Sequence, residues 1–321
     1  MPITSVGSWL PTIDEFITHW TAVNTFLSPG ELILSNNYKF SSLQSDRTAI
    51  AAQIADVQAK LNLRTTASGD RDIKRAALMD RIGQFRAAVP AQLPGSRYLV
   101  SLPALPPFTA SPGKWRDSLD DMSNLWTTIN TNAPAVPGFT PPLILGGPYP
   151  IATFTTDKTA MDTAFTNVAT TDQNLQQSRE LRDKLFQPVY QKLKEYRLGV
   201  VGGLPPGNVL LNSIPRLTPQ PGSTPPATNI SGVWNPVTNE ADLTWEALSI
   251  PNLDYWSVRA HPGPKWRNDE AETIAQVFPP ALTYSTTHGL VAPGSSVLLA
   301  VFTVATTGNE KRSNVVKVTR P

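Results

Sequence analysis

Two kinds of hydrophobic spacing divide this chain. Up to about residue 222, apolar residues recur three or four positions apart, which is the period of an amphipathic helix. In the first third of the chain this spacing predicts three helices, at Ile13 to Leu27, Ile50 to Leu61 and Leu78 to Val89. From about residue 226, seven short β-rich runs separated by turn sequences such as APGSS follow one another. Such runs predict a small antiparallel sandwich.

The helical part is an internal duplication. The segment TIDEFITHWTAVNT, at 12–25, aligns with SLDDMSNLWTTINT, at 118–131, and after a five-residue insertion the register continues at an offset of 111 residues. We therefore expect a multidomain α plus β chain, with tandem three-helix modules at 8–113 and 114–222 and a β-sandwich at 226–321. Positions kept in both copies include Trp20 with Trp126, Tyr38 with Tyr149, and Arg71 with Arg182.

Each copy opens with a capping signal. Thr12 with Glu15, and Ser118 with Asp121, resemble the capping box in which a hydroxyl and a carboxylate satisfy the first backbone amides of a helix. Two acidic pairs lie here, Asp14 with Glu15 and Asp120 with Asp121. Neighbouring residues on a helix point about 100° apart, so we interpret these pairs as groups that stabilise the start of a helix, and not as the acid and base of a glycosidase.

The last part of the chain resembles a fibronectin type III domain. The sequences LTWEA, LDYWSVRA and VFTVATTGNEKRSNVVKV carry this resemblance, which covers roughly residues 226–321. It implies core or turn positions for Trp245, Gly308, Ser313 and Asn314. The tyrosine usual near the start of strand F is replaced by Val297. The whole chain also resembles uncharacterised bacterial proteins that pair a duplicated helical region with such a domain, which implies an architecture but no reaction.

The amino-acid composition argues against several classes of partner and site. Charged residues make up 16% and the net charge is +2, which argues against nucleic acid and an anionic membrane as partners. The absence of cysteine excludes disulfides, thiolate metal sites and a cysteine nucleophile. We find no signal peptide and no apolar stretch of membrane-span length. We therefore expect the protein in the cytoplasm, or at the surface or outside the cell by a nonclassical route.

The three histidines do not suggest a metal site. His19, His261 and His288 lie far apart in sequence and show no metal-ligand spacing, so we expect neither a metal nor a cofactor. The second copy has Leu125 at the position of His19, which favours a structural role for that histidine. The basic residues of the third predicted helices are interleaved with acids, so we interpret them as a solvated face.

Four residues of the sandwich are candidates for binding. Trp266 follows the sequence HPGPK in a predicted loop, near Tyr255, Arg259 and His261. Aromatic and arginine side chains are typical of contact surfaces. The alternative is that Trp266 folds over the edge of its own sandwich.

These observations favour a noncatalytic structural or interaction protein. The version we prefer is a homo-oligomeric building block, with the chain itself as partner, in a surface or extracellular assembly. One alternative is a module that binds a glycan or peptide with the sandwich loops. A third is an enzyme whose site lies between the two helical copies.

Overall fold

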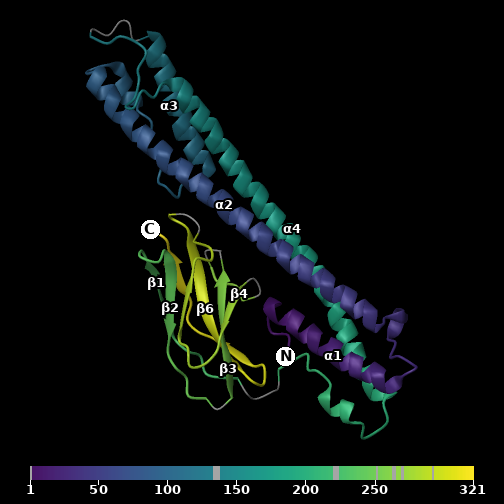
Figure 1. The fold of residues 1–321 in the computed structure, drawn as a ribbon. Coiled ribbons are helices and arrows are strands. Elements are labelled where there is room, and N and C mark those ends of the chain that lie inside the picture. Colours follow the sequence, from purple (N-terminus) through teal and green to yellow (C-terminus); the bar gives the residue numbers. More distant parts are fainter. Residues whose placement is uncertain are drawn as a thin grey trace. The chain divides into compact units, whose positions relative to one another are not determined.

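The computed structural model (Figure 1) describes residues 2–132, 138–219, 224–250, 252–261, 265–268, 271–290 and 293–321. Within these residues, helices precede an antiparallel β region, so the predicted α plus β class is confirmed. The α-helices are α1 (Trp9–Leu27), α2 (Phe40–Gln92), α3 (Pro112–Asn132) and α4 (Ile151–Gly203). Short 3-10 helices accompany them: η1 (Val6–Ser8), η2 (Ser35–Asn37), η3 (Arg97–Ser101) and η5 (Val209–Ser213).

Each repeat copy holds one short and one long α-helix, and not the three predicted. The second and third predicted helices of the first copy are parts of the continuous 53-residue helix α2, and α4 has the same length. The segment at 62–77 lacks proline, and its one glycine, Gly69, costs only about 1 kcal/mol relative to alanine in a helix. The segment at 173–185 lacks both residues. The polar stretches at 62–77 and 173–185 therefore continue the helix, because neither contains a proline to end it.

The predicted capping boxes are also wrong. Helix α1 begins at Trp9, so Thr12 lies inside it and donates its hydroxyl to the Ser8 carbonyl across 2.7 Å. Helix α3 begins at Pro112, and Ser118 is likewise internal. Proline is tolerated in a first helical turn because the amide it lacks has no partner there. Both helices therefore start upstream of the predicted caps.

The chain divides into two compact units, and the division crosses both long helices. Unit 1 comprises Met1–Asn62 with Leu175–Pro321, and unit 2 comprises Leu63–Asn174. The copy boundary expected near residue 113 falls inside unit 2. Each unit therefore contains helical segments from both repeat copies.

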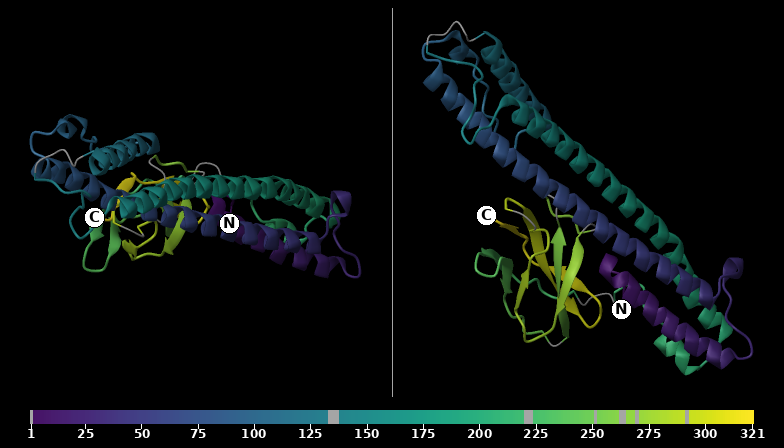
Figure 2. Two further views of the ribbon diagram at one scale, coloured as in Figure 1. Left: turned by 90° about the horizontal axis from the view of Figure 1, so that it is seen from above. Right: turned by 45° about the horizontal axis from the view of Figure 1, so that its top comes forward.

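The helical core of unit 1 combines α1 with the first part of α2 and the last part of α4. Figures 1 and 2 show α1 beside the C-terminal part of α4. Trp9 stacks on Phe186 with ring centroids 4.1 Å apart, and Trp20 lies 4.6 Å from Tyr196. Such buried aromatic pairs contribute about 0.5–1.5 kcal/mol beyond the area they bury. The predicted core role of Trp20 is confirmed, because this side chain is fully buried.

Unit 2 has the corresponding core from α3, the last part of α2 and the first part of α4. Trp126 is fully buried, with its ring 5.4 Å from Phe85 and 5.7 Å from Phe154. Its indole nitrogen donates to the Leu143 carbonyl at 2.9 Å. The two tryptophans kept in both copies are therefore core residues of their respective units.

The β region is a two-sheet antiparallel sandwich. One sheet has the order β1-β2-β5, and the other has the order β4-β3-β6-β7, with β8 also pairing with β6. Strand β7 lies in a segment predicted as a turn, and it pairs with the long strand β6. The strands are β1 (Ile230–Asn235), β2 (Glu240–Trp245), β3 (Leu253–His261), β4 (Glu272–Val277), β5 (Thr283–Thr286), β6 (Ser296–Ala305), β7 (Glu310–Arg312) and β8 (Val316–Thr319).

The positions implied by the fibronectin type III resemblance have the expected places. Trp245 is buried between the sheets, 6.3 Å from Trp256. Gly308 lies in the turn after β6 with a φ of 80°, a conformation that favours glycine. The Asn314 side chain bonds both the amide and the carbonyl of Ile230 in β1, at 2.8 and 2.9 Å. This asparagine therefore joins the segment before β8 to the first strand of the sandwich.

Candidate functional site

The four predicted binding residues gather on one face of the second sheet. Tyr255, Arg259 and His261 alternate along β3, so they point to the same side, and each is less than 8% exposed. Trp266 is half-buried, with its ring 6.1 Å from His261 and 6.4 Å from Phe302. The Arg259 guanidinium lies 3.9 Å from the centre of the Phe302 ring. The structure thus brings the four together in a mostly buried cluster.

Polar contacts join two members of this cluster to neighbouring residues of the sandwich. Arg259 makes a two-bond ion pair with Glu310, at 2.6 and 3.0 Å. The Trp266 indole donates to Asn268 at 2.6 Å, and Arg312 donates to the same oxygen at 3.1 Å. These contacts fit a Trp266 that packs over its own sandwich, the alternative noted from the sequence.

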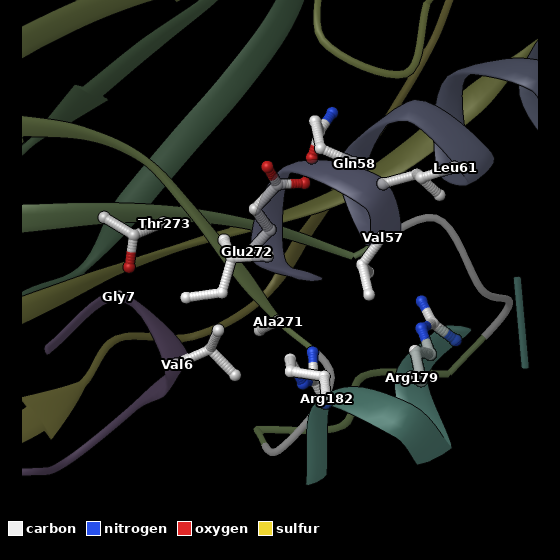
Figure 3. Close-up of a pocket in the computed structure, with 11 residues that line it drawn as sticks. Val6, Gly7, Val57, Gln58, Leu61, Arg179, Arg182, Ala271, Glu272 and Thr273 are labelled. Carbon is white, nitrogen blue, oxygen red and sulfur yellow. The ribbon is translucent and has the colours of Figure 1, made fainter. Parts of the chain in front are cut away.

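A second site lies in unit 1 and involves none of those four residues. It is a cavity of about 120 Å³ lined by η1, α2, α4 and the start of β4 (Figure 3). Ile54, Val57 and Leu61 stand three or four positions apart on α2, so they present one apolar face to the cavity. Val6 adds a further apolar side chain from η1.

Close backbone approach shapes one wall of this pocket. A Cβ atom on Gly7 would lie 3.0 Å from Oγ1 of Thr273, a distance that side chains rarely adopt. Nearby, Oγ1 of Thr4 donates to Glu310 at 3.4 Å, and the Ile3 amide donates to the Leu217 carbonyl at 3.1 Å. The segment before α1 is therefore held against both the sandwich and the end of the helical part of unit 1.

Among the described residues that line the pocket, Glu272 is the acid, and its ionisation is unusual. Burial raises the pKa of Glu272 to about 7, while the positive charge of Arg179 acts to lower it. Desolvation disfavours the charged carboxylate, which is why burial dominates. The group is therefore part protonated and part ionised near neutral pH.

The neighbouring Gln58 is a hydrogen-bond partner of Glu272. The Gln58 amide faces the Glu272 carboxyl at close range (Figure 3), and Asn62 lies 3.1 Å from its other end. Two acceptors cannot bond each other, so the Gln58 nitrogen is the atom that suits an ionised Glu272. With the amides of Gln58 and Asn62 both turned, Gln58 donates to Glu272 and accepts from Asn62. Gln58 therefore joins α2 to the start of β4.

Further charged groups stand around the same carboxyl. Nε2 of His288 lies 3.6 Å from Oε2 of Glu272, and burial lowers the pKa of His288, so the imidazole is neutral near pH 7. On α4, Arg182 is 8% exposed and pairs with Asp183 at 2.8 Å. Arg179 and Arg182 both line the pocket from α4.

The pocket is built largely from positions that the repeat copies do not share. Arg182 is kept, because Arg71 stands in its place and pairs in the same way with Asp72, at 2.8 Å. Val57 is kept as well, as Val168, but three other positions differ in character: Ala169 stands for Gln58, Asp172 for Leu61, and Ser68 for Arg179. Sequence reasoning missed this site, although the mismatch between otherwise aligned copies was a signal that pointed to it.

Two further findings concern the described part of the chain. None of its helices combines the length and apolar character needed to cross a membrane. Within the same residues, His, Asp and Glu side chains form no group of three or more that could hold a metal ion.

Comparisons with known proteins include fibronectin type III domains that cover the C-terminal part of the chain. No protein-family model and no curated protein sequence matches the chain. A Fn3-like protein from Clostridium thermocellum is 26% identical over 30% of this chain and 91% of its own, with a TM-score of 0.24. The sixth fibronectin type III domain of a human protein is 19% identical over 32% of this chain and 92% of its own, with a TM-score of 0.26.

Enzyme structures also match over a similar share of the chain. Pectate lyase PelI from Erwinia chrysanthemi, in complex with tetragalacturonic acid, is 16% identical over 29% of this chain, with a TM-score of 0.25. The chain spans only 28% of that lyase's length. Fibronectin type III domains are thus among the solved structures that the chain resembles.

Proposed function

We propose that this chain is a noncatalytic interaction protein that assembles with copies of itself. The observation that carries the proposal is an apolar surface near the end of α4. Leu198 and Val201 are 76% and 59% exposed, and they stand three positions apart on one helix face. Val209, in the following η5, is 77% exposed. We refer to Leu198 and Val201 as the α4 end surface.

Exposed side chains of this size favour association. Burying a Val or Leu side chain that water otherwise surrounds contributes about 1.5–3 kcal/mol. A second copy offers the identical surface, so a two-fold contact would pair like with like. The net charge of +2 adds little repulsion between copies.

The polar groups kept in both helical copies support a structural role. Asp14 pairs with Arg47 at 2.9 Å, and Asp120 pairs with Lys158 at the equivalent place. In each copy the pair joins the short helix to the start of the long one. Retained charges therefore stabilise the module itself.

Light scattering of the full chain over a range of concentrations tests the proposal. We expect the average mass to rise above that of the monomer, and the Leu198→Asp/Val201→Asp variant to stay monomeric. Val237→Asp is the matched control, because Val237 is 87% exposed in the turn between β1 and β2. A strictly monomeric wild type at high concentration, or equal assembly by all three proteins, would overturn the proposal.

A further inference from the structure

We propose that a groove between η3 and α3 in unit 2 binds a short peptide with free, charged ends. This inference is independent of self-association, since the α4 end surface lies in unit 1. The groove has a volume of about 610 Å³, which is within the ~300–1,000 Å³ range typical of small-molecule sites. Arg97 and Tyr98 line it from η3, and Asp121, Asn124 and Leu125 line it from α3.

The equivalent place in the first repeat copy is bridged by a histidine. The helices η3 and η5 correspond, since each spans five residues and begins two positions after a glycine with a positive φ. Nε2 of His19 lies 2.9 Å from the Leu210 carbonyl oxygen, and this bond joins α1 to η5. In the second copy Leu125 stands for His19 and Tyr98 stands for Leu210. A leucine side chain has no hydrogen-bonding group, so the bridge is lost and the groove lies in its place.

Two polar side chains of the groove also distinguish the second copy. Arg97 stands where the first copy has Val209, and Asn124 stands where it has Thr18. Asp121 and Asn124 are three positions apart on α3, so one face of this helix carries both the acid and the amide. Opposite charges therefore line the groove, the arginine from η3 and the aspartate from α3.

The two charged groups of the groove have no polar partner within the chain. Arg97 and Asp121 are exposed, and among the residues that the structure describes neither side chain forms an ion pair or a hydrogen bond. The Arg97 guanidinium lies 5.5 Å from the centre of the Tyr98 ring, a contact that leaves its N–H donors available to an acceptor. Two opposite charges in one groove match a ligand that carries both signs.

A short peptide supplies both signs at its ends. Its carboxylate matches Arg97, because a guanidinium binds a carboxylate through two parallel hydrogen bonds, and its ammonium group matches Asp121. Between the ends, each peptide group offers a donor and an acceptor, and the side-chain amide of Asn124 offers the same pair. Leu102 and Leu125 add apolar lining for a ligand side chain.

Isothermal titration of the full chain with the dipeptide alanyl-leucine tests the site. We expect binding at millimolar ligand, weakened about fivefold by Asp121→Asn and by Arg97→Gln, as is typical of one exposed charged contact. Blocking one end of the ligand identifies each contact. N-acetyl-alanyl-leucine, which lacks the ammonium group, should bind equally to the wild type and Asp121→Asn, and alanyl-leucine amide should bind equally to the wild type and Arg97→Gln.

Three further variants serve as controls. Asp80→Asn should leave binding unchanged, because Asp80 is an exposed acid of unit 2 outside the groove. Leu125→His introduces the residue of the first copy, so we expect it to bond the Tyr98 carbonyl, narrow the groove and weaken binding. Leu198→Asp/Val201→Asp should bind the dipeptide as the wild type does, whether or not the chain self-associates.

Several outcomes would refute the site. They are absence of binding at millimolar dipeptide, equal binding of the free and blocked dipeptides, and unchanged binding by Leu125→His. Losses that are the same for every ligand would show that the two charged residues act on folding alone, which also contradicts the proposal.

Discussion

Tyr38 donates its hydroxyl hydrogen to Asp46 across 2.6 Å, which ties the segment before α2 to the first turns of that helix. Tyr149 and Asp157 form the same bond at 2.5 Å in front of α4. In each copy the tyrosine also closes a small antiparallel bridge, to Leu34 or to Leu145. The pKa of both phenols is raised, first by burial and then by the bond to the aspartate. Both phenols therefore keep their proton at neutral pH and remain hydrogen-bond donors.

Removing either phenol hydroxyl should destabilise the unit that contains it. We expect Tyr38→Phe and Tyr149→Phe each to lower the free energy of unfolding by about 1–2 kcal/mol, because a partly buried hydrogen bond to a carboxylate is lost. The bonds lie in separate units, so the double variant should show the sum of both effects. Urea denaturation measures this. Tyr190→Phe is the control, because its hydroxyl has no hydrogen bond within the described residues; an equal loss there would contradict the argument.

His19 is a buried residue that only the first repeat copy has. Its ring bonds the Tyr196 hydroxyl at 2.6 Å and the Leu210 carbonyl at 2.9 Å, so it joins α1 to α4 and η5. Leu125 fills the equivalent place in α3. His19→Leu should fit sterically but cost about 1–3 kcal/mol, because two buried polar groups lose their partner. Chemical denaturation of this variant beside Leu125→Ile measures the cost, and an unchanged midpoint would show that these bonds contribute little.

The repeat and the β-sandwich were accessible from the sequence because they depend on local spacing. The 111-residue register aligned Tyr38 with Tyr149 and Asp46 with Asp157 before any contact was known. The structural role predicted for His19 is confirmed by its buried bonds. These successes rest on patterns that repeat within one chain.

The missed features depend on contacts between distant segments. Gln58 and Glu272 meet only because β4 lies against α2, and no local pattern encodes that approach. The division into units arises because the first part of α2 packs with α1 and its last part packs with α3. Helical periodicity is the same along both parts of α2, so it does not reveal this division. Burial of Arg259 was likewise hidden, because its partner Glu310 lies on another strand.

The ion pair between Arg259 and Glu310 should be costly to break. Their side chains are 4% and 16% exposed, so Glu310→Gln leaves a buried positive charge without its partner, at about 3–5 kcal/mol. Glu31→Gln is the matched control, since the pair of Glu31 with Lys39 is 2.7 Å long but well exposed and should contribute less than about 1 kcal/mol. Thermal unfolding of both variants checks this. Similar losses at the two sites would contradict the assigned role of burial.

Glu272 should make stability fall as pH rises. Its pKa is about 7 in the folded chain and near the ordinary 4.5 when unfolded, so the folded state binds more protons between these values. The stabilising contribution is complete below about pH 4.5 and is lost as pH rises through 7. His288 acts in the opposite direction, because burial lowers its pKa, but Glu272→Gln retains that effect. Comparing this variant with the wild type therefore isolates Glu272.

Melting temperatures measured from pH 5 to pH 8 make the comparison. Because the glutamine is neutral at every pH, the wild type should lose stability relative to Glu272→Gln as pH rises, most steeply between about pH 5 and pH 7 and little above that range. Glu246→Gln on the exposed side of the sandwich serves as the reference for a carboxylate without burial. Parallel curves for the wild type and Glu272→Gln would show that burial does not raise the pKa of Glu272.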